Sequence, residues 1–561
     1  MAYQPTAAYG QQIEIDPVAR VAGALALRAV ADPAGGMSDA TVMAPTFRGY
    51  EVLLKDRDIR DSIFISSRAC GVCGGAHAMC SALALEMTFG AWPPAFGIVI
   101  RNVLSALESL IDHPSHLLTR AGPDYSETVV RETNPELWAR AQRTPAAGQE
   151  IHGLKNVSDI MAGLTRFTGP LYREALTMSR TAREAYVLMG GKYPHPQTIV
   201  PGGISSTVDP SDLNLALLRV VKFLDYSRKV AAIWDDLVAF FYEADERYRQ
   251  VGEGPANFID LGMWDDPYAY DGTYENSEAW GERRWSTPGA IINGQLQTTR
   301  LADIDSNIEE YVDHSFYEDW VGSGEQAVAE DPLGNPLSAR HPWNKQTLPK
   351  PADPNPSGKY TWSTAPRWRR NAMETGPGAR LWITAMAEKM PHRGFLEPSG
   401  RSLRFGLPPT AMPAAELEWH VPETWNAFER NRARAYGLVH ATLVAYENLI
   451  IGFDLARIGG PESGIFAHYN IPKDHVIGVG FWGGARGYIS HHVEVNDRVI
   501  RNYQIVAPST FMAARDSTGA PGPFEQAVMA TPALATHGQE RHIDVLRAIR
   551  SFDPCMSCST H

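Results

Sequence analysis

Four cysteines, set in two C-x-x-C pairs near opposite ends of the chain, are the residues best suited to chemistry. The first pair lies in the segment R-A-C-G-V-C-G-G-A-H at 68–77, and the second lies in D-P-C-M-S-C-S-T-H at 553–561. The cysteines are Cys70, Cys73, Cys555 and Cys558. Their spacing lets two thiolates bind one metal ion or form a redox-active pair. Because nearly the whole chain separates the pairs, only a folded core can bring all four thiols together.

The spacing alone leaves three kinds of site open. Five cysteines in 561 residues are too few for a disulfide framework. Four thiolates are typical of structural zinc, although zinc usually joins short segments. A catalytic metal is the second possibility, and a thioredoxin-like dithiol is the third, but neither pair lies in a βαβ pattern. The fifth cysteine, Cys80, is best explained as a small buried apolar side chain.

The composition is that of a globular protein with a large core, at 44% hydrophobic and 20% charged residues. A formal net charge of -13 excludes a basic surface for nucleic acid. The sequence contains no run of about 18 apolar residues, so it predicts no transmembrane helix. The first residues lack the features of a signal peptide. We therefore expect a cytoplasmic or peripherally membrane-associated protein that binds no nucleic acid.

Long segments with helical periodicity run through the chain. Apolar residues recur at helical spacing over 97–120, and further helical patterns cover about 171–190, 211–249 and 425–452. These are longer than average helices and favour a bundle. The predicted fold class is therefore mainly α: a large multi-helical bundle with peripheral β-sheets. We expect one domain over residues 1–561, since both halves of the cysteine site must be held together.

Short strands are predicted at both ends of the chain, within 11–50 and from 476 to 506. Helices are predicted from Phe47, from Ala76 to Met87, and at about 538–550 before the second cysteine pair. Residues of about 255–370 are rich in tryptophan but show no sustained periodicity. A disordered linker would lack such aromatic content, so we expect an ordered, irregular insertion packed on the bundle.

The sequence resembles the large, catalytic subunits of the nickel–iron hydrogenases over essentially its whole length. The resemblance rests on motifs whose chance occurrence at these positions is very improbable. They are Arg68-x-Cys70-x-x-Cys73-x-x-x-His77, Asp553-Pro554-Cys555-x-x-Cys558-x-x-His561, Arg48-Gly-Tyr-Glu51, Ala485-Arg486-Gly487 and Pro508-Ser-Thr510.

The resemblance implies a nickel–iron centre that cleaves H2 heterolytically into two protons and two electrons, working physiologically toward oxidation. Nickel would take all four thiolates, and iron, carrying one CO and two cyanide ligands, would share those of Cys73 and Cys558. Soft thiolates suit redox-active nickel, whereas closed tetrahedral zinc has no redox role. The first proton is implied to go to Cys555 or Arg486.

The resemblance also implies a magnesium ion or a similar divalent ion near the C-terminus. Its ligands would be Glu51, the backbone carbonyl of Ile505 and His561, with water completing an octahedron. The family is usually made as a precursor that a maturation protease trims after metal insertion. This chain ends at the histidine matching that cut, so we expect the mature form.

Further roles are implied around the centre. Arg486 would overhang the open metal position, held by Asp112 and Asp553, where a guanidinium could polarise H2 or help take its proton. Ser509 would hydrogen-bond a cyanide ligand, and His77 would hydrogen-bond a bridging thiolate and tune it. For the neighbouring His113 and His116, ordinary buried hydrogen bonding is as good an explanation as a functional role.

Two positions depart from the family pattern. Ala22 stands where many relatives have a glutamate that carries the proton away, and Ala485 replaces the proline that often precedes the overhanging arginine. The first departure removes a titratable group, so we expect the carboxylates beside Arg486 to take the proton. The alternatives are Glu14, Glu51 with metal-bound water, or an ordered chain of water past Ala22. Together with the long insertion, the departures suggest the actinobacterial-type branch, which is high in affinity and oxygen-tolerant.

The implied partner is an iron–sulfur small subunit. Four cysteines are committed to the metal centre and only Cys80 remains, so this chain cannot hold a four-cysteine cluster itself. A higher oligomer of such heterodimers is expected. The alternatives are a related large subunit linked to NAD(P) or deazaflavin, and a hydrogenase-like subunit of a respiratory complex that has lost its metals. The second class typically lacks the cysteines that are present here.

Overall fold

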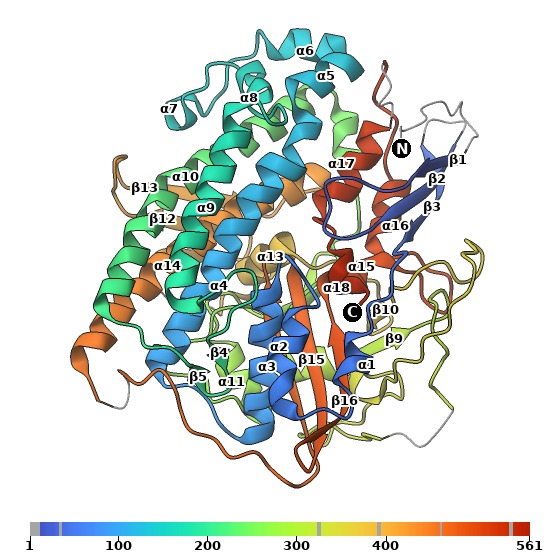
Figure 1. Cartoon of the computed structure of the whole chain (residues 1–561). Helices are drawn as coiled ribbons and strands as arrows, with labels where there is room; N and C mark the ends of the chain where they lie inside the picture. The colour runs from blue at the N-terminus through green and yellow to red at the C-terminus, as the bar shows by residue number, and fades with distance from the viewer. Residues whose placement is uncertain (1–11, 33–35, 323–326, 390–393, 461–462, 538–541) are drawn as a thin grey trace.

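Four long helices pack together as a bundle, on the left in the view of Figure 1. The computed structural model describes residues 12–32, 36–322, 327–389, 394–460, 463–537 and 542–561. The long helices are α4 (Ala95–Ser115), α9 (Pro170–Gly190), α10 (Pro210–Ala244) and α14 (Ala427–Ile458). Both α4 and α10 pack against α14 and against α9. The predicted bundle of long helices with small sheets around it is therefore confirmed.

Local sequence explains where these helices begin. Asp209 caps α10 by accepting from the N–H groups of Ser211 and Asp212, and Pro210 occupies the first helical position. Asn426 caps α14 in the same way, accepting from Phe428 and Glu429. These caps satisfy amide groups that the first turn of a helix leaves without partners.

The C-terminal end of α4 changes its winding. Pro114 lies inside the helix, and a π-helical turn follows at His116–Arg120. Proline removes one backbone donor, and π-helical turns re-aim side chains, often at functional sites. The helical pattern predicted over 97–120 is thus one α-helix followed by a π turn.

Helix α14 is the one described helix that is long and apolar enough to cross a membrane by length and composition. In the structure 67% of its apolar window is buried, against α4 and α10 on the two sides. The apolar length of α14 is therefore explained by its place in the core.

Three strands near the C-terminus form the sheet on which the first cysteine segment rests. They are β14 (Val476–Gly484), β15 (Gly487–Asn496) and β16 (Val499–Val506), paired antiparallel in chain order. Helix α3 (Gly74–Phe89) packs directly on β14. A Cβ added at Gly480 would lie 1.8 Å from the carbonyl oxygen of Cys80, so the close approach requires glycine.

Cys80 belongs to this contact and not to the metal site. It is fully buried, and its thiol donates to the Gly480 carbonyl at 3.1 Å. Burial raises its pKa well above the ordinary value, so it stays a neutral thiol. The expectation of a small buried side chain is confirmed.

The remaining elements are short. The other sheets are β1 (Gln12–Ile15), β2 (Ala26–Ala31) and β3 (Met37–Met43); β4 (Ile199–Val200) and β5 (Gly203–Ile204); β6 (Phe258–Asp260), β7 (Gly289–Ile292) and β8 (Gln295–Thr298); β9 (Ile308–Tyr311) and β10 (Ala365–Trp368); β11 (Leu396–Pro398), β12 (Ser402–Leu407) and β13 (Ala415–His420). The shorter helices are α1 (Tyr50–Leu54), α2 (Ser62–Ser67), α5 (Glu127–Thr133), α6 (Pro135–Ala141), α7 (Gln149–His152), α8 (Val157–Gly163), α11 (Ser277–Gly281), α12 (Leu301–Ser306), α13 (Pro377–Ala387), α15 (Pro508–Ala513), α16 (Pro523–Met529), α17 (Ile543–Ser551) and α18 (Met556–Ser559). The helix expected at about 538–550 is α17, and residues 538–541 lie outside the described part of the chain.

The tryptophan-rich region of 255–370 is ordered in its described parts. It contributes short strands, α11 and α12, and most of its tryptophans are buried; Trp362 is half-buried. Trp343 reaches the central sheet, where its indole N–H donates to the carbonyl of Gly478 at 3.2 Å. Burial of these rings accounts for order without helical periodicity.

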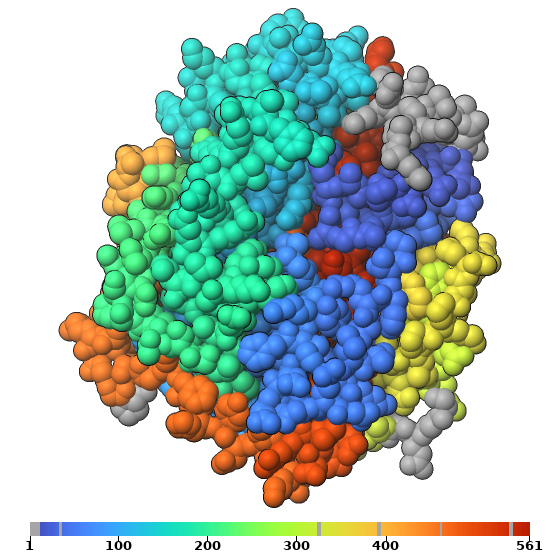
Figure 2. All heavy atoms as spheres, viewed as in Figure 1, coloured from blue at the N-terminus to red at the C-terminus, as the bar shows by residue number. Residues whose placement is uncertain are grey.

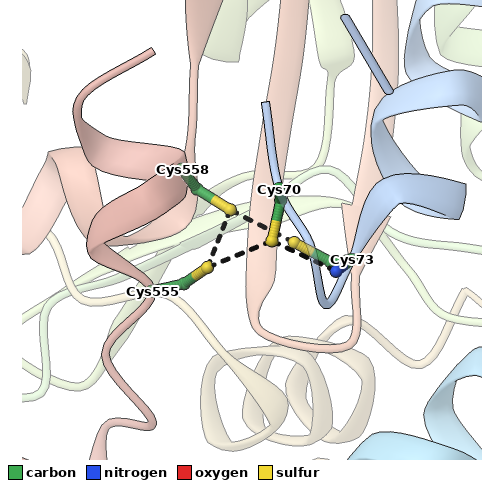
Figure 3. Close-up of side chains that lie close together, drawn as sticks. All are labelled: Cys70, Cys73, Cys555 and Cys558. Atoms are coloured by element: carbon green, nitrogen blue, oxygen red, sulfur yellow. Dashed lines mark hydrogen bonds between the residues drawn. The ribbon is translucent and has the colours of Figure 1, made fainter. Parts of the chain in front are cut away.

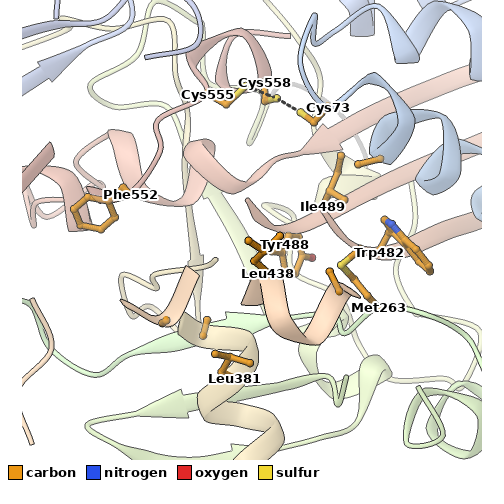
Figure 4. Packing of buried hydrophobic residues seen from close by; sticks show 14 of the residues in the cluster. Cys73, Met263, Leu381, Leu438, Trp482, Tyr488, Ile489, Phe552, Cys555 and Cys558 are labelled. Carbon is orange, nitrogen blue, oxygen red and sulfur yellow. Dashed lines mark hydrogen bonds between the residues drawn. The ribbon is translucent and has the colours of Figure 1, made fainter. Parts of the chain in front are cut away.

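The two ends of the chain are joined beside the second cysteine pair. The N–H of Ala22 donates to the Pro554 carbonyl at 3.0 Å, and the N–H of Met556 donates to the Ala22 carbonyl at 2.8 Å. The cysteines themselves lie in the main apolar core, with Phe552 and Ile489 in the same cluster (Figure 4). The second cysteine pair is therefore held both by hydrogen bonds to the N-terminal segment and by packing in the main core.

Candidate metal centre

The four paired cysteines meet at one point, and their sulfurs converge from two segments (Figure 3). The Sγ–Sγ distance is 3.3 Å for Cys70 and Cys555, 3.1 Å for Cys73 and Cys558, and 2.9 Å within the second pair. All four are buried and none forms a disulfide. The closure predicted from the two motifs is what the structure contains.

Two turns aim the sulfurs. Cys73 is the N-cap of α3, and the N–H groups of Val72 and Cys73 point at the Cys70 sulfur at 3.3 and 3.1 Å. Cys555 is likewise the N-cap residue of the short helix α18. Cysteine thiolates at helix N-termini are stabilised by the local positive potential.

The electrostatics of the cluster favour a bound cation. Burial raises the pKa of Cys70, but the thiol contacts around it, above all with Cys555, bring it well below the ordinary value. Contacts with the other sulfurs, followed by burial, raise the pKa of Cys73 well above its ordinary value. Four crowded sulfurs thus cannot all ionise without a compensating positive charge. A soft metal ion provides that charge, so the residues present fit a thiolate-bound metal.

Arg486 lies over the cluster on the β14–β15 hairpin, as predicted, between two carboxylates. Its guanidinium contacts Asp112 at 2.6 Å and Asp553 at 2.9 Å, and all three residues are buried. Its Nη1 has no hydrogen-bond partner within the described residues. Burial lowers its pKa, but the two carboxylates, and then the sulfurs of Cys555 and Cys73, raise it well above normal. The guanidinium is therefore a fixed positive charge whose Nη1 has N–H groups free to donate beside the thiols.

Two further arginines complete this arrangement, and sequence reasoning missed both. Arg120, from the π turn, lies 3.1 Å from Asp553 and 3.3 Å from Asp112. Arg434, from α14, lies 3.4 Å from Asp553. Burial raises the pKa of Asp553, but Arg486, His116 and the two added arginines bring it well below the ordinary value. Neither arginine lies in a short motif, so only the meeting of α4 with α14 identifies them.

His113 and His116 take ordinary buried roles in the same layer. His116 Nδ1 lies 3.2 Å from Asp553, and His113 Nδ1 lies 3.3 Å from Arg434. Burial lowers the pKa of both rings, so both are neutral. They orient the charged residues above the thiols.

A hydrogen-bond chain determines the tautomer of His77. The Tyr503 hydroxyl donates to Ser81 at 2.8 Å, so His491 Nδ1 donates to Tyr503 at 2.7 Å. His491 Nε2 then accepts from His77 Nδ1 at 3.1 Å. Burial lowers the pKa of His77 to about 4, so the ring is neutral and its Nε2 bears no hydrogen. In this tautomer Nε2 can only accept a hydrogen bond, and it has no partner among the described residues.

Ser509 lies against the second cysteine pair. Its hydroxyl oxygen accepts the Cys555 N–H at 2.8 Å, which leaves the hydroxyl hydrogen to donate toward a ligand. Ser509 follows Pro508 at the start of α15, directly after β16. The end of β16 at Val506 and the start of α15 at Pro508 therefore place the hydroxyl.

Glu51 and His561 also meet, at 3.1 Å between Oε1 and Nε2. The backbone N–H of Ile505 donates to the same carboxylate at 3.0 Å. A lysine that sequence reasoning missed, Lys345, lies 3.3 Å from Glu51 and 3.0 Å from Glu310. Burial raises the pKa of Glu51, but Lys345 and His561 bring it to about 2. The Lys345 ammonium therefore lies between two buried carboxylates, while Glu51 and His561 together offer an oxygen and a nitrogen donor of the kinds that bind a divalent cation.

A second group of metal-type ligands is accounted for by its own hydrogen bonds. Asp305, His341 and His492 are buried together. His492 Nε2 donates to the Asp305 carboxylate at 2.7 Å, and His341 Nε2 donates to the Asp305 carbonyl at 3.1 Å. With the Trp343 N–H donating to His341 Nδ1, these bonds account for the group except for His492 Nδ1, which has no partner among the described residues.

Comparisons with known proteins agree with this geometry. The family model described as nickel-dependent hydrogenase matches residues 48–158 and 168–561. This chain belongs to the nickel-dependent hydrogenase family. The resemblance inferred from the cysteine motifs is therefore confirmed. Both matched segments carry one cysteine pair each.

Individual hydrogenases match over nearly the full length. The uptake hydrogenase large subunit of Rhizobium leguminosarum bv. viciae is 29% identical, over 98% of this chain and 95% of the relative. The hydrogenase-1 large chain of Escherichia coli is 26% identical with the same coverage. A solved structure of an actinobacterial-type NiFe-hydrogenase from Ralstonia eutropha H16 is 38% identical, with a TM-score of 0.95 over 98% of this chain and 100% of that one. This nickel-dependent hydrogenase is thus similar to a member of the actinobacterial-type branch, which the departures at Ala22 and Ala485 suggested.

Proposed function

We propose that the chain is the catalytic large subunit of a hydrogenase that oxidises H2 to protons and electrons at a nickel–iron centre. The observation that carries the proposal is the meeting of four buried thiols under a buried guanidinium whose Nη1 is free to donate. The match to uptake hydrogenase large subunits gives the direction of the reaction. Zinc would explain the thiols, but it would leave the charged residues above them without a purpose.

Nickel would be held by the four thiolates, and iron by those of Cys73 and Cys558. Ser509, whose hydroxyl hydrogen is free, is the proposed donor to a cyanide ligand on iron. The bound metals would supply the redox steps and the Lewis acidity that weakens the H–H bond.

Arg486 is the proposed electrostatic group of the reaction. Asp112 and Asp553 hold its guanidinium on one side, so the free Nη1 is fixed on the other side. A donor fixed before the reaction stabilises developing negative charge without reorganisation. Cys555, directly below, is the proposed first acceptor of the proton.

Glu51, His561 and the Ile505 carbonyl are the proposed ligands of a magnesium-type ion. The Gln504 amide nitrogen donates to both Glu51 carboxylate oxygens at 3.0 and 3.1 Å and so helps to hold the carboxylate in place. Magnesium found in the isolated protein by elemental analysis would support this site.

The electrons require an iron–sulfur small subunit, which we propose docks beside the first cysteine pair. Gly71, between Cys70 and Cys73, is exposed, so the loop reaches the surface. The exposed apolar side chains of Val52, Leu53 and Phe64 lie on the neighbouring helices α1 and α2. Figure 2 shows the C-terminal segment at the bottom of a gap between these helices and the N-terminal sheet. A partner seated here would close that gap.

Elemental analysis and H2 uptake together test the function. The isolated large subunit is expected to hold nickel and iron in equal amounts. The complex, whose iron–sulfur partner adds further iron, is expected to reduce a dye under H2. Zinc alone, with no uptake, would overturn the proposal. A complex that needs NAD or deazaflavin as acceptor would favour the related class of large subunit. Maturation by a protease and assembly of heterodimers into a higher oligomer belong to the same proposal, as does one functional unit over 1–561.

A further inference from the structure

Glu108 is a buried carboxyl group close to the cysteine cluster for which nothing above gives a role. It lies on α4 one turn before Asp112, so both side chains leave the same face of the helix. It is 4% exposed, and its Oε1 has no hydrogen-bond partner among the described residues. Burying an unpaired carboxyl oxygen is costly, so a function is the natural explanation.

Glycine on α3 makes room for this carboxyl group. A Cβ added at Gly75 would lie 2.7 Å from Glu108 Oε2 and 2.8 Å from the hydroxyl of Tyr186. Gly75 is the second residue of α3, and Cys73 is the N-cap of that helix. The carboxyl group and the phenol therefore both reach the turn that carries the first cysteine pair.

The charges facing Glu108 keep a proton on it. Burial raises its pKa, and the Asp112 carboxylate and the Cys70 sulfur raise it further. Arg486 and the backbone of Gly75 act in the opposite direction but do not reverse the shift, so the pKa stands well above normal. A neutral carboxyl group both donates and accepts a hydrogen bond, as a proton carrier must.

Two tyrosines continue from Glu108 toward the surface. The rings of Tyr186 and Tyr193 pack edge to face, 5.3 Å apart. Tyr193 is half-buried, and its hydroxyl donates to the Val72 carbonyl at 3.1 Å. Burial and then the Glu108 charge raise the pKa of both phenols well above normal, so both remain protonated.

Asp553, one of the two carboxylates that hold Arg486, is a poor proton acceptor. Asp553 is held by three arginines and a histidine, which keep its pKa well below normal, so it binds a proton weakly. Ala22, on the other side of Cys555, does not titrate. Glu108 is thus the protonatable carboxyl group that the structure places on the Cys70 side of the cluster.

We propose that Glu108 relays protons from the cysteine cluster toward the surface past the hydroxyl of Tyr186. The proposal rests on the proposed hydrogenase function. In each step Glu108 releases the proton that it holds toward Tyr186 and takes up another from the side of the cluster, so its O–H bond is restored. Two protons leave per H2, while both electrons pass to the iron–sulfur partner.

The central test compares the complex containing the parent large subunit with Glu108→Gln, which keeps the shape and hydrogen bonding but carries no proton. H2 oxidation is expected to fall about 100-fold, with nickel and iron content unchanged and a larger solvent isotope effect. Glu108→Asp, which keeps a carboxyl group, is expected to recover part of the rate. Glu429→Gln is the matched control, since Glu429 is also buried with a raised pKa but lies elsewhere, and parental turnover is expected.

A measurement without turnover tests the proton directly. Infrared spectra of the resting complex are expected to show a carbonyl band of a protonated carboxyl group that shifts in D2O and is missing from Glu108→Gln. Absence of that band from the parent, or a parental rate in Glu108→Gln, overturns the relay. If Glu108→Gln fails to assemble its metals, Tyr186→Phe decides: an at least tenfold slower rate supports the path, and a parental rate overturns it. A parent complex that oxidises no H2 would instead refute the proposed function.

Discussion

At the scale of single residues, the site is a balance of buried charges. Asp112 and Asp553 each contact more than one guanidinium, and Arg486 contacts both carboxylates. Removing one member of a buried ion pair costs about 3–5 kcal/mol, because the other charge is left without compensation. The charged layer therefore keeps Arg486 in one position, and its conservative replacement is the informative one.

Replacing Arg486 with Lys retains the charge but removes the planar, multi-donor group. Lysine cannot bind both carboxylates and also present a free donor to the thiols. H2 oxidation is expected to fall about 100-fold or more, with metal content intact, as measured by dye reduction and elemental analysis. Arg367→Lys is the control, since Arg367 is likewise buried and paired with Asp516 at 3.1 Å. Near-parental turnover of Arg486→Lys would leave Arg486 a structural role only.

At the scale of elements, the site depends on the contact between α3 and the β14–β15 hairpin. Cys73 is the N-cap of α3, and the hairpin carries Arg486. The distance between the helix and the hairpin therefore sets the space between the thiols and the guanidinium. Gly480 allows α3 to approach the sheet closely. Two glycines flank the tip, where Gly487 has φ +114° and a Cβ would lie 2.2 Å from Thr375.

Gly480→Ala is expected to separate α3 from β14. The new Cβ would meet backbone and not a flexible side chain, so the strand must move. Overpacking of this kind costs about 1–3 kcal/mol or more, and nickel content is expected to fall with it. Unfolding in urea and metal analysis measure both effects. Gly406→Ala, in β12, is the control, because its nearest contact is 3.6 Å and little change is expected.

A histidine in α14 links stability to pH. Burial lowers the pKa of His440 to about 3, and its Nε2 donates to the Trp285 carbonyl at 3.0 Å. The unfolded chain binds a proton near pH 6.5, whereas the folded chain does not, so this stability is present above pH 6.5 and is lost as the pH falls toward 3.

His440→Gln removes this titration and keeps a side-chain donor. Between pH 7 and pH 5 the parent is expected to lose about 2 kcal/mol more than the variant. Urea midpoints at the two pH values measure the difference. Equal losses in the two proteins would mean that the ring is protonated in the folded state.

At the scale of the whole molecule, the metal centre closes the chain on itself. The first cysteine pair comes from the N-terminal part, the second from the last residues, and one core surrounds both. The exposed apolar side chains of α1 and α2 lie on the same side as the first cysteine loop. This is the side on which we propose that the partner docks and collects electrons.

Replacing both Leu53 and Phe64 with aspartate is expected to weaken binding of the iron–sulfur subunit at least tenfold. The interface would then bury two charges in place of apolar surface. Loss of co-purification and of H2 oxidation with the natural acceptor measures the effect, while nickel content stays parental. Leu218→Asp is the control, since Leu218 is 58% exposed on α10. Unchanged association would place the partner on another face.

The sequence predicted the elements that depend on local interactions. The four long helices and the terminal strands follow from periodicity and caps, because those signals lie within a few residues of one another. The irregular region of 255–370 could be predicted only as ordered, since its rings are buried by distant parts of the chain.

The sequence by itself determined which side chains can bind soft metals, because four thiols at two fixed spacings allow little other chemistry. Only the tertiary structure decided what surrounds them. Arg434, Arg120 and Lys345 lie outside short motifs, and they come to the site through packing of helices and loops far apart in the chain. Glu108 has the same origin, because its raised pKa depends on burial and on the charge of Asp112 and Cys70. Charge and burial act through space, so they become visible only when the chain is folded.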